Sequence, residues 1–231
     1  MVIREADELR VSAESVLKDF VGPERNHLEY VVLALMARIR ELQNAARNLM
    51  DHSPEAPIAI ITLARAQYES YLQLRYILIQ PKPDEREKLA RDLMKFAEYD
   101  HVESIGNDRD VYRAWLGDGE KEHFERRIQI HDDVKRNLSK AQKKQGRNAT
   151  WNGLSIAETA KAVGVTGHSQ WYGVMSKVAH SVPSMFHKSI TIAQDGYVLG
   201  NVERGEKDAI EWLERMNRVL ELAIGSVPTE K

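Results

Sequence analysis

The chain has no cysteine and almost no net charge, and each absence excludes a class of protein. Without cysteine it can form no disulfide, no thiolate zinc site and no cysteine nucleophile. Its formal net charge is -2 over 231 residues, so no global charge attracts nucleic acid or an anionic membrane, and only a local basic patch could do so. A chain of this length can still bury a sizeable core.

Long apolar runs are also missing. Charged residues crowd the first ten positions, where a secretory signal would need an apolar segment. The most apolar stretch, residues 58–79, is interrupted by Arg65, Glu69 and Arg75 and is therefore not expected to span a membrane. We expect a cytoplasmic protein with no membrane-embedded part.

Apolar residues recur at helical spacing along most of the chain. The pattern predicts long helices over residues 3–20, 24–50, 58–79, 84–106, 120–145, 171–187 and 206–224, with a short helix at 155–163. Alternating apolar residues around Asp195 and Gly196 predict one small β-hairpin near residues 189–200. No linker separates two domains, so we predict one all-α domain over residues 1–231, a single bundle of about seven helices.

The helix predicted at 58–79 is apolar nearly all round, which indicates that it is buried. Yet a polar seam runs along it, formed by Thr62, Arg65, Glu69 and Gln73. A lone buried charge is costly unless it is paired. Arg65 and Glu69 stand four residues apart and can pair, either to hold the fold together or to face a ligand.

The next-to-last long helix carries a matching polar line, with Tyr172, Ser176 and His180 each four residues from the next. His180 can act as a general base or acid because its unperturbed pKa lies near neutrality, or it can be a hydrogen-bonded core residue. Ser176 can hydrogen-bond the imidazole or act as a nucleophile. We predict that the two seams meet in one site, in which Tyr172 binds and four residues are catalytic: Arg65, Glu69, Ser176 and His180.

No pattern points to a bound metal or cofactor. The chain contains no H-E-x-x-H, and the consecutive residues His131, Asp132 and Asp133 point in different directions on a helix. No glycine-rich phosphate loop follows a predicted strand. We therefore expect no metal and no cofactor.

A basic run ends the helix predicted at 120–145. Cations at a helix C-terminus face the negative end of the helix dipole, which explains such a run without any ligand. The second explanation is a patch that contacts phosphates, with Lys140, Lys143 and Lys144 as binding residues.

Residues 155–175 resemble a helix-turn-helix motif, with Ala160, Gly164 and Val165 at its small, turn and apolar positions. The second half departs from the motif because Gln170 stands at a normally apolar position and no Lys or Arg follows for DNA contacts. DNA binding is therefore a third functional hypothesis, after the two stated below.

Arg47 and His52 match the R-x4-6-H signature of HEPN ribonucleases, helical bundles that cleave RNA without a metal. Asn48 supplies the polar residue that this family favours after the arginine. Arg126 and His131 match the bare spacing as well. With 8 histidines in the chain, about two such spacings are expected by chance, so the spacing alone carries little information. Arg47 and His52 are retained as candidate binding residues.

Three segments resemble an uncharacterised bacterial family of all-helical domains of unknown function: ARAQYESYLQLRYI (64–77), WNGLSIAETAKAVGV (151–165) and WYGVMSKVAHS (171–181). In that family an Arg-x3-Glu helix recurs with a Tyr-x3-Ser-x3-His helix, and the similarity spans residues 30–190. The resemblance implies no reaction. Some members are similar in outline to HEPN-type bundles of toxin–antitoxin and phage-defence systems.

Two functional hypotheses follow. The leading one is a HEPN-like, metal-independent ribonuclease or an inactive relative, in which Arg65 holds an RNA phosphate and His180 transfers a proton. The competing one is a non-enzymatic module that binds a small anionic ligand or a protein partner. A homodimer is compatible with a broad-faced bundle, although no sequence feature requires one.

Overall fold

The computed structural model describes residues 1–20, 26–53, 57–106, 108–138, 150–179, 191–192, 198–199 and 202–228. These residues contain nine helices, so the predicted all-α class is confirmed. The predicted count of about seven covers the long helices. The short helix predicted at 155–163 is present as α8 (Ile156–Ala162), and the structure adds a second helix of seven residues, α5 (Arg109–Trp115).

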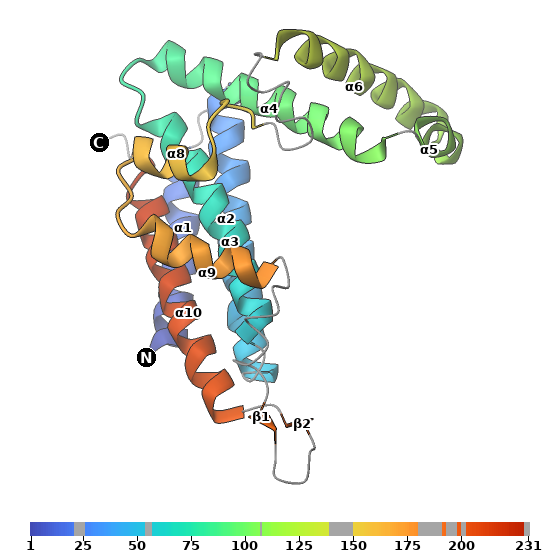
Figure 1. Ribbon diagram of the computed structural model, residues 1–231. Helices are drawn as coiled ribbons and strands as arrows, with labels where there is room; N and C mark the ends of the chain where they lie inside the picture. Colours follow the sequence, from blue (N-terminus) through green and yellow to red (C-terminus); the bar gives the residue numbers. More distant parts are fainter. Residues whose placement is uncertain are drawn as a thin grey trace. The chain divides into compact units, whose positions relative to one another are not determined.

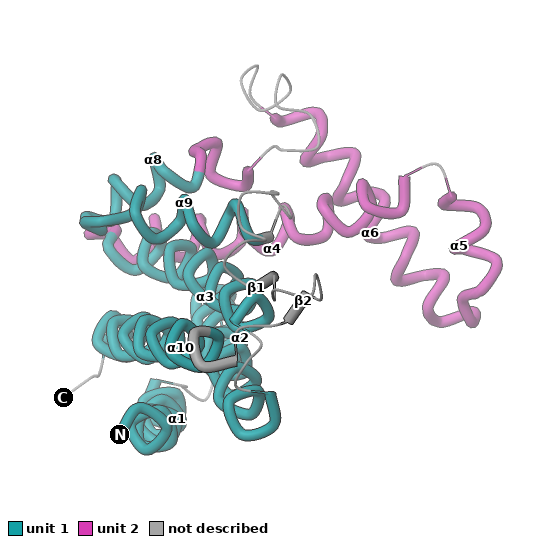
Figure 2. The backbone as a smooth tube through the Cα atoms, turned by 60° about the horizontal axis from the view of Figure 1, so that its bottom comes forward, with its two compact units in different colours: residues 1–79, 156–231 teal, residues 80–155 magenta. Residues whose placement is uncertain are grey.

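The chain divides into two compact units (Figure 2). Unit 1 comprises residues 1–79 and 156–231, and unit 2 comprises residues 80–155. Unit 2 is therefore inserted in the sequence between two segments that pack together as unit 1. The prediction of one domain over residues 1–231 stays a prediction.

Four long helices form the core of unit 1: α1 (Val2–Phe20), α2 (His27–His52), α3 (Pro57–Leu78) and α10 (Val202–Ile224). α3 packs against α2 and α10, and α1 packs against the same two helices (Figure 1). The side chains between them are removed from water, among them Ile39, Leu72 and Leu213. Burial of such apolar surface is the main favourable term in folding.

Buried side-chain amides tie three of these helices together. Gln43 of α2 donates from Nε2 to Oδ1 of Asn217 in α10 over 2.8 Å. Asn217 in turn donates from Nδ2 to the backbone oxygen of Val2 in α1 over 3.1 Å. Both amides are buried, so these bonds satisfy groups that have lost their water and fix the register of the three helices.

Two further helices of unit 1, α8 and α9 (His168–Ala179), pack against α3. The turn between them contains Gly164 and Gly167, with φ of 75° and 76°. Glycine adopts this left-handed conformation at little cost, so the two residues set where α8 ends and α9 begins. α9 therefore starts at His168, before the predicted start at Trp171.

One further predicted boundary is wrong. α2 begins at His27 and not at residue 24, because Asn26 caps it by accepting the Glu29 amide at Oδ1 over 2.9 Å. α6 (Asp118–Asn137) is followed by Leu138 as its C-terminal cap. The rest of the helix predicted to residue 145 lies outside the described residues.

Unit 2 is built on the packing of α4 (Pro83–Ile105) against α6. His131 of α6 is 1% exposed, and its ring stacks on Tyr99 of α4 at 5.1 Å. Nε2 of His131 lies 2.7 Å from Oε1 of Glu103. This hydrogen bond lowers the pKa of Glu103, although burial acts in the opposite sense. Glu103 and His131 therefore join the two helices.

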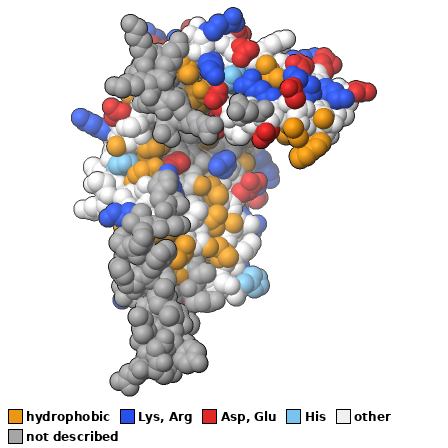
Figure 3. Space-filling view, turned by 45° about the vertical axis from the view of Figure 1, so that its right-hand side comes forward, with side chains coloured by type: hydrophobic (Ala, Val, Ile, Leu, Met, Phe, Trp, Pro, Cys, Tyr) orange, Lys and Arg blue, Asp and Glu red, His pale blue; other side chains and the backbone are white. Residues whose placement is uncertain are grey.

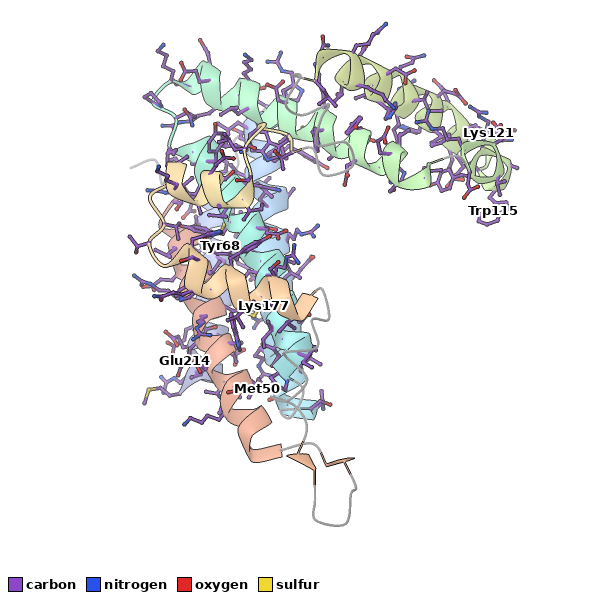
Figure 4. The ribbon with its side chains drawn as sticks, in the orientation of Figure 1. Met50, Tyr68, Trp115, Lys121, Lys177 and Glu214 are labelled. Carbon is purple, nitrogen blue, oxygen red and sulfur yellow. The ribbon has the colours of Figure 1, made fainter. Side chains whose placement is uncertain are left out.

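The surface of unit 2 carries charges of both signs, interspersed rather than gathered (Figure 3). Cross-helix ion pairs such as Arg113 with Glu125, at 2.7 Å, belong to this surface. Trp115 at the end of α5 is 82% exposed and points away from the other helices of the unit (Figure 4).

The β-structure of the described residues consists of β1 (Thr191–Ile192) and β2 (Val198–Leu199). They pair antiparallel, with Thr191 opposite Leu199 and Ile192 opposite Val198. The other residues of the hairpin predicted near 189–200 lie outside the described residues. A pairing of two residues on each side leaves the all-α class unchanged.

Candidate functional site

Arg65, Glu69 and Tyr172 form a hydrogen-bonded group between α3 and α9, named here the Arg65 cluster. Nε of Arg65 donates to Oε1 of Glu69, one turn away on α3, over 2.9 Å. The Tyr172 hydroxyl donates to the same carboxylate oxygen over 2.9 Å and accepts from Nη2 of Arg65 at 3.3 Å. The structure thus brings these three predicted residues together.

The cluster is half-buried, whereas the apolar composition of α3 indicated full burial. The side chains of Arg65 and Glu69 are 22% and 30% exposed, and Thr62 one turn earlier is exposed. α3 buries its other faces against the long helices α2 and α10, but the shorter α9 covers the polar seam only in part. Water reaches the ion pair, so it stabilises the fold by at most about 1 kcal/mol.

Electrostatics hold the cluster in one charge state. Burial alone lowers the pKa of Arg65, but the hydrogen bond and the charge of Glu69 raise it, so the guanidinium stays protonated. Burial and the same carboxylate raise the pKa of the Tyr172 phenol, which stays neutral at ordinary pH. One positive charge is therefore balanced by one negative charge.

A histidine outside the predicted set adjoins the cluster. Oη of Tyr68 in α3, which lies beside α9 in Figure 4, is 2.9 Å from Nδ1 of His168. The His168 ring stacks on the Tyr172 ring at 5.0 Å. His168 stands four residues before Tyr172 and extends the stripe of Tyr172 and Ser176. The four-residue spacing from Tyr172 could have indicated His168 as part of the site, but the helix was predicted to begin after His168.

The protonation of Tyr68 and His168 decides what they offer a ligand. Burial raises the pKa of Tyr68 to about 12, so the phenol keeps its proton, and we assign it as the donor to Nδ1 of His168. Burial lowers the pKa of His168, so at pH 7 the imidazole is neutral and carries its own proton on Nε2. The site thus presents donors, Arg65 and His168, while the Glu69 carboxylate is already engaged. Such a set suits an anion.

Ser176 lies one turn beyond Tyr172 on α9 and is half-buried. His180 lies outside the described residues, as do Lys140, Lys143 and Lys144. The catalytic roles of Ser176 and His180 and the phosphate-binding role of the three lysines stay predictions.

Arg47 and His52 lie apart from the Arg65 cluster. Both belong to the last two turns of α2, and Nε of Arg47 lies 3.5 Å from Oδ1 of Asp7 in α1, whereas the cluster lies between α3 and α9. Arg47 forms an ion pair with Asp51 of the same helix. The candidate binding residues therefore do not form one group.

Arg126 and His131, the second pair with HEPN spacing, both belong to α6 but lie on different faces of it. Arg126 is exposed and pairs with Glu122, whereas His131 is buried against Glu103. The two side chains point to different surroundings and cannot act on one phosphate.

Two kinds of site are not found in the part of the chain that the structure describes. No three histidine or acidic side chains gather closely enough there to hold a metal ion. Nor does any of the described helices combine the length and apolarity that crossing a membrane requires.

The protein is therefore an all-α protein with a half-buried Arg–Glu–Tyr cluster between two of its helices. A family model described as a family of unknown function (DUF5677) matches residues 29–197. Because the match covers more than half of the chain, the chain belongs to this family. The resemblance to an uncharacterised helical family is thereby confirmed. No curated protein and no solved structure matches the chain.

Proposed function

We propose that the protein is a non-cleaving, HEPN-like relative that binds RNA, with the Arg65 cluster as the phosphate-binding site. The observation that carries the proposal is the fixed orientation of an accessible arginine. Glu69 and Tyr172 hold the guanidinium from two helices, and 22% of the Arg65 side chain remains exposed. A pre-oriented guanidinium loses less conformational freedom when it binds a phosphate.

His168 adds two features that suit RNA. Its Nε2–H is a second donor beside the arginine, since Nδ1 accepts from Tyr68. Its ring and that of Tyr172 are stacked at 5.0 Å, and single-stranded RNA is commonly bound by stacking of its bases on such aromatic rings. The described site lacks an unengaged base, which supports binding without cleavage.

The proposal is tested by fluorescence anisotropy with a short labelled single-stranded RNA in EDTA. We expect Arg65→Met to weaken binding by about tenfold or more, because a charge-assisted contact is lost. Tyr172→Phe is expected to weaken it less, since the arginine loses one of its supports. Arg126→Met, an exposed arginine of unit 2, serves as the matched control and should bind as the parent does. Equal affinities for the parent and Arg65→Met would contradict the proposal.

The second candidate is a metal-independent ribonuclease in which Arg65 holds the phosphate and His180 transfers the proton. It is supported by the α9 stripe of Tyr172 and Ser176, on which His180 follows four residues later in the sequence. RNA should then be cleaved in EDTA, and His180→Ala should abolish cleavage. Cleavage that persists in both His180→Ala and His52→Ala excludes this candidate.

DNA binding and association with a protein have less support. A DNA-reading helix contacts bases and phosphates through Lys or Arg, but the first half of α9, residues 168–174, carries neither. A homodimer or a protein partner remains a proposal, for which light scattering of the purified chain gives the oligomeric state directly.

A further inference from the structure

A groove of about 580 Å³ lies in unit 1, on the side of α3 where the α8–α9 turn meets α10. Its apolar part includes Tyr71 of α3, which is 5% exposed, and Val219 of α10, which is 4% exposed. Trp171 of α9 adds a second, half-buried aromatic wall. This volume lies in the range of pockets that hold small organic ligands.

Two arginines from different helices converge on this groove. Arg75 comes from α3 and Arg218 from α10, and both line it. Tyr71 lines the groove with them; burial raises the pKa of its phenol, and the positive charges of Arg75 and Arg218 act in the opposite sense. The groove therefore joins aromatic surface to concentrated positive charge.

The two arginines differ in how far their charge is compensated. Among the described residues, no carboxylate lies within ion-pair distance of Arg75, whose side chain donates to the Ser226 hydroxyl at 3.5 Å. Arg218 pairs with Glu221 one turn along α10, and both of these side chains are more than half exposed. Within this group of three, two positive charges face one negative charge.

We infer that the groove binds a nucleoside phosphate. Guanidiniums from two helices suit a phosphate, which accepts several charge-assisted hydrogen bonds at once. The half-buried Trp171 offers aromatic surface to the flat base. The inference does not depend on the RNA-binding proposal, because neither Arg75 nor Arg218 belongs to the Arg65 cluster.

Isothermal titration of the full chain with AMP tests the inference, with inorganic phosphate and adenosine as separate probes. We expect AMP to bind more tightly than either probe. Arg75→Met and Arg218→Met should each weaken AMP binding by about tenfold, and Arg75→Lys should recover part of the loss because it keeps the charge. Glu221→Gln should strengthen binding, since it removes the opposing negative charge.

Two control variants test whether AMP binding depends on the arginines of this groove and not on arginines elsewhere in the chain. Arg65→Met should leave AMP binding unchanged even if it abolishes RNA binding, and Arg126→Met should change neither. Circular dichroism establishes that each variant is folded. The inference is overturned if AMP does not bind at millimolar concentration, or if Arg75→Met binds it as the parent does. Binding of phosphate alone as tightly as AMP refutes the role of Trp171.

Discussion

The phenol oxygen of Tyr68 lies 2.9 Å from Nδ1 of His168, so a buried side chain of α3 fixes the first turn of α9. The same histidine stacks on Tyr172, which reaches Arg65 and Glu69. The aromatic contacts and the ion pair of the site are therefore parts of one connected arrangement.

Tyr68→Phe should leave the pKa of His168 below its ordinary value of 6.5. Burial of the imidazole lowers this pKa, and a phenyl ring at position 68 keeps the imidazole buried. The loss of one hydrogen bond should also cost about 1 kcal/mol of stability. NMR titration of the imidazole measures the pKa. Tyr30→Phe, at a residue 54% exposed, is the control and should leave it unchanged.

The same histidine predicts how stability depends on pH. The pKa of His168 is lowered in the folded state, so below its ordinary value of 6.5 the unfolded chain binds a proton that the folded chain does not. Stability should fall as the pH drops through 6.5 and should level off below the folded-state pKa. His168→Gln keeps an acceptor for Tyr68 without titrating. Urea titrations at pH 7.5 and 5.5 should show a smaller difference for this variant than for the parent.

The double substitution Arg65→Met with Glu69→Leu should change the free energy of unfolding by less than about 1 kcal/mol, because water reaches the half-buried ion pair. Denaturant titration measures this, with the exposed pair Arg4 and Glu8 as the matched control. Unchanged stability means that the pair is retained for function. A loss of several kcal/mol would instead make the cluster a clamp between α3 and α9.

Asn217→Leu should cost about 2 kcal/mol, because it leaves the buried Gln43 amide of α2 without its partner. Adding Gln43→Leu should recover part of the loss, since it removes that stranded amide. A double-mutant cycle from chemical denaturation gives the coupling. Additive losses would show that the two amides do not interact.

Acid should weaken unit 2 through Glu103. The pKa of this carboxyl is lowered in the folded state, so it contributes stability above its ordinary value of 4.5. That contribution is lost as the pH falls through the folded-state pKa. Hydrogen-exchange protection factors of the α6 amides, which are corrected for the slower intrinsic exchange in acid, should therefore decrease below pH 4.5 in the parent. In Glu103→Gln the decrease should be smaller, and an equal decrease would assign it to other carboxyls.

Local periodicity predicted the part of the site that depends on spacing within a helix. Arg65 and Glu69 on α3, and Tyr172 on α9, lie at helical intervals, and the structure joins them. His168 was missed because the start of α9 depends on the backbone conformation of Gly167. The partial exposure of the Arg65 side chain could not be predicted either. It depends on how much of α3 is covered by α9, a short helix far away in the sequence.

The groove beside Tyr71 shows a further limit of sequence patterns. Arg75 and Arg218 stand far apart in the chain, and only Arg75 lies in a segment, 64–77, that carries the family resemblance. They meet because α3 packs against α10, a non-local contact that a helical pattern leaves undetermined. The division into two units was likewise missed, although Pro81, Pro83 and a rise in charged residues follow the apolar stretch 58–79.

The packing of α10 has a practical consequence for anyone expressing part of this chain. The family match covers residues 29–197 and leaves out α10, yet α10 packs against α2 and α3 and buries Leu213, Met216 and Leu220. A fragment cut at the limits of the match would expose the apolar faces of α2 and α3 to water and would tend to aggregate. A fragment for expression should therefore extend beyond the matched residues and include α10.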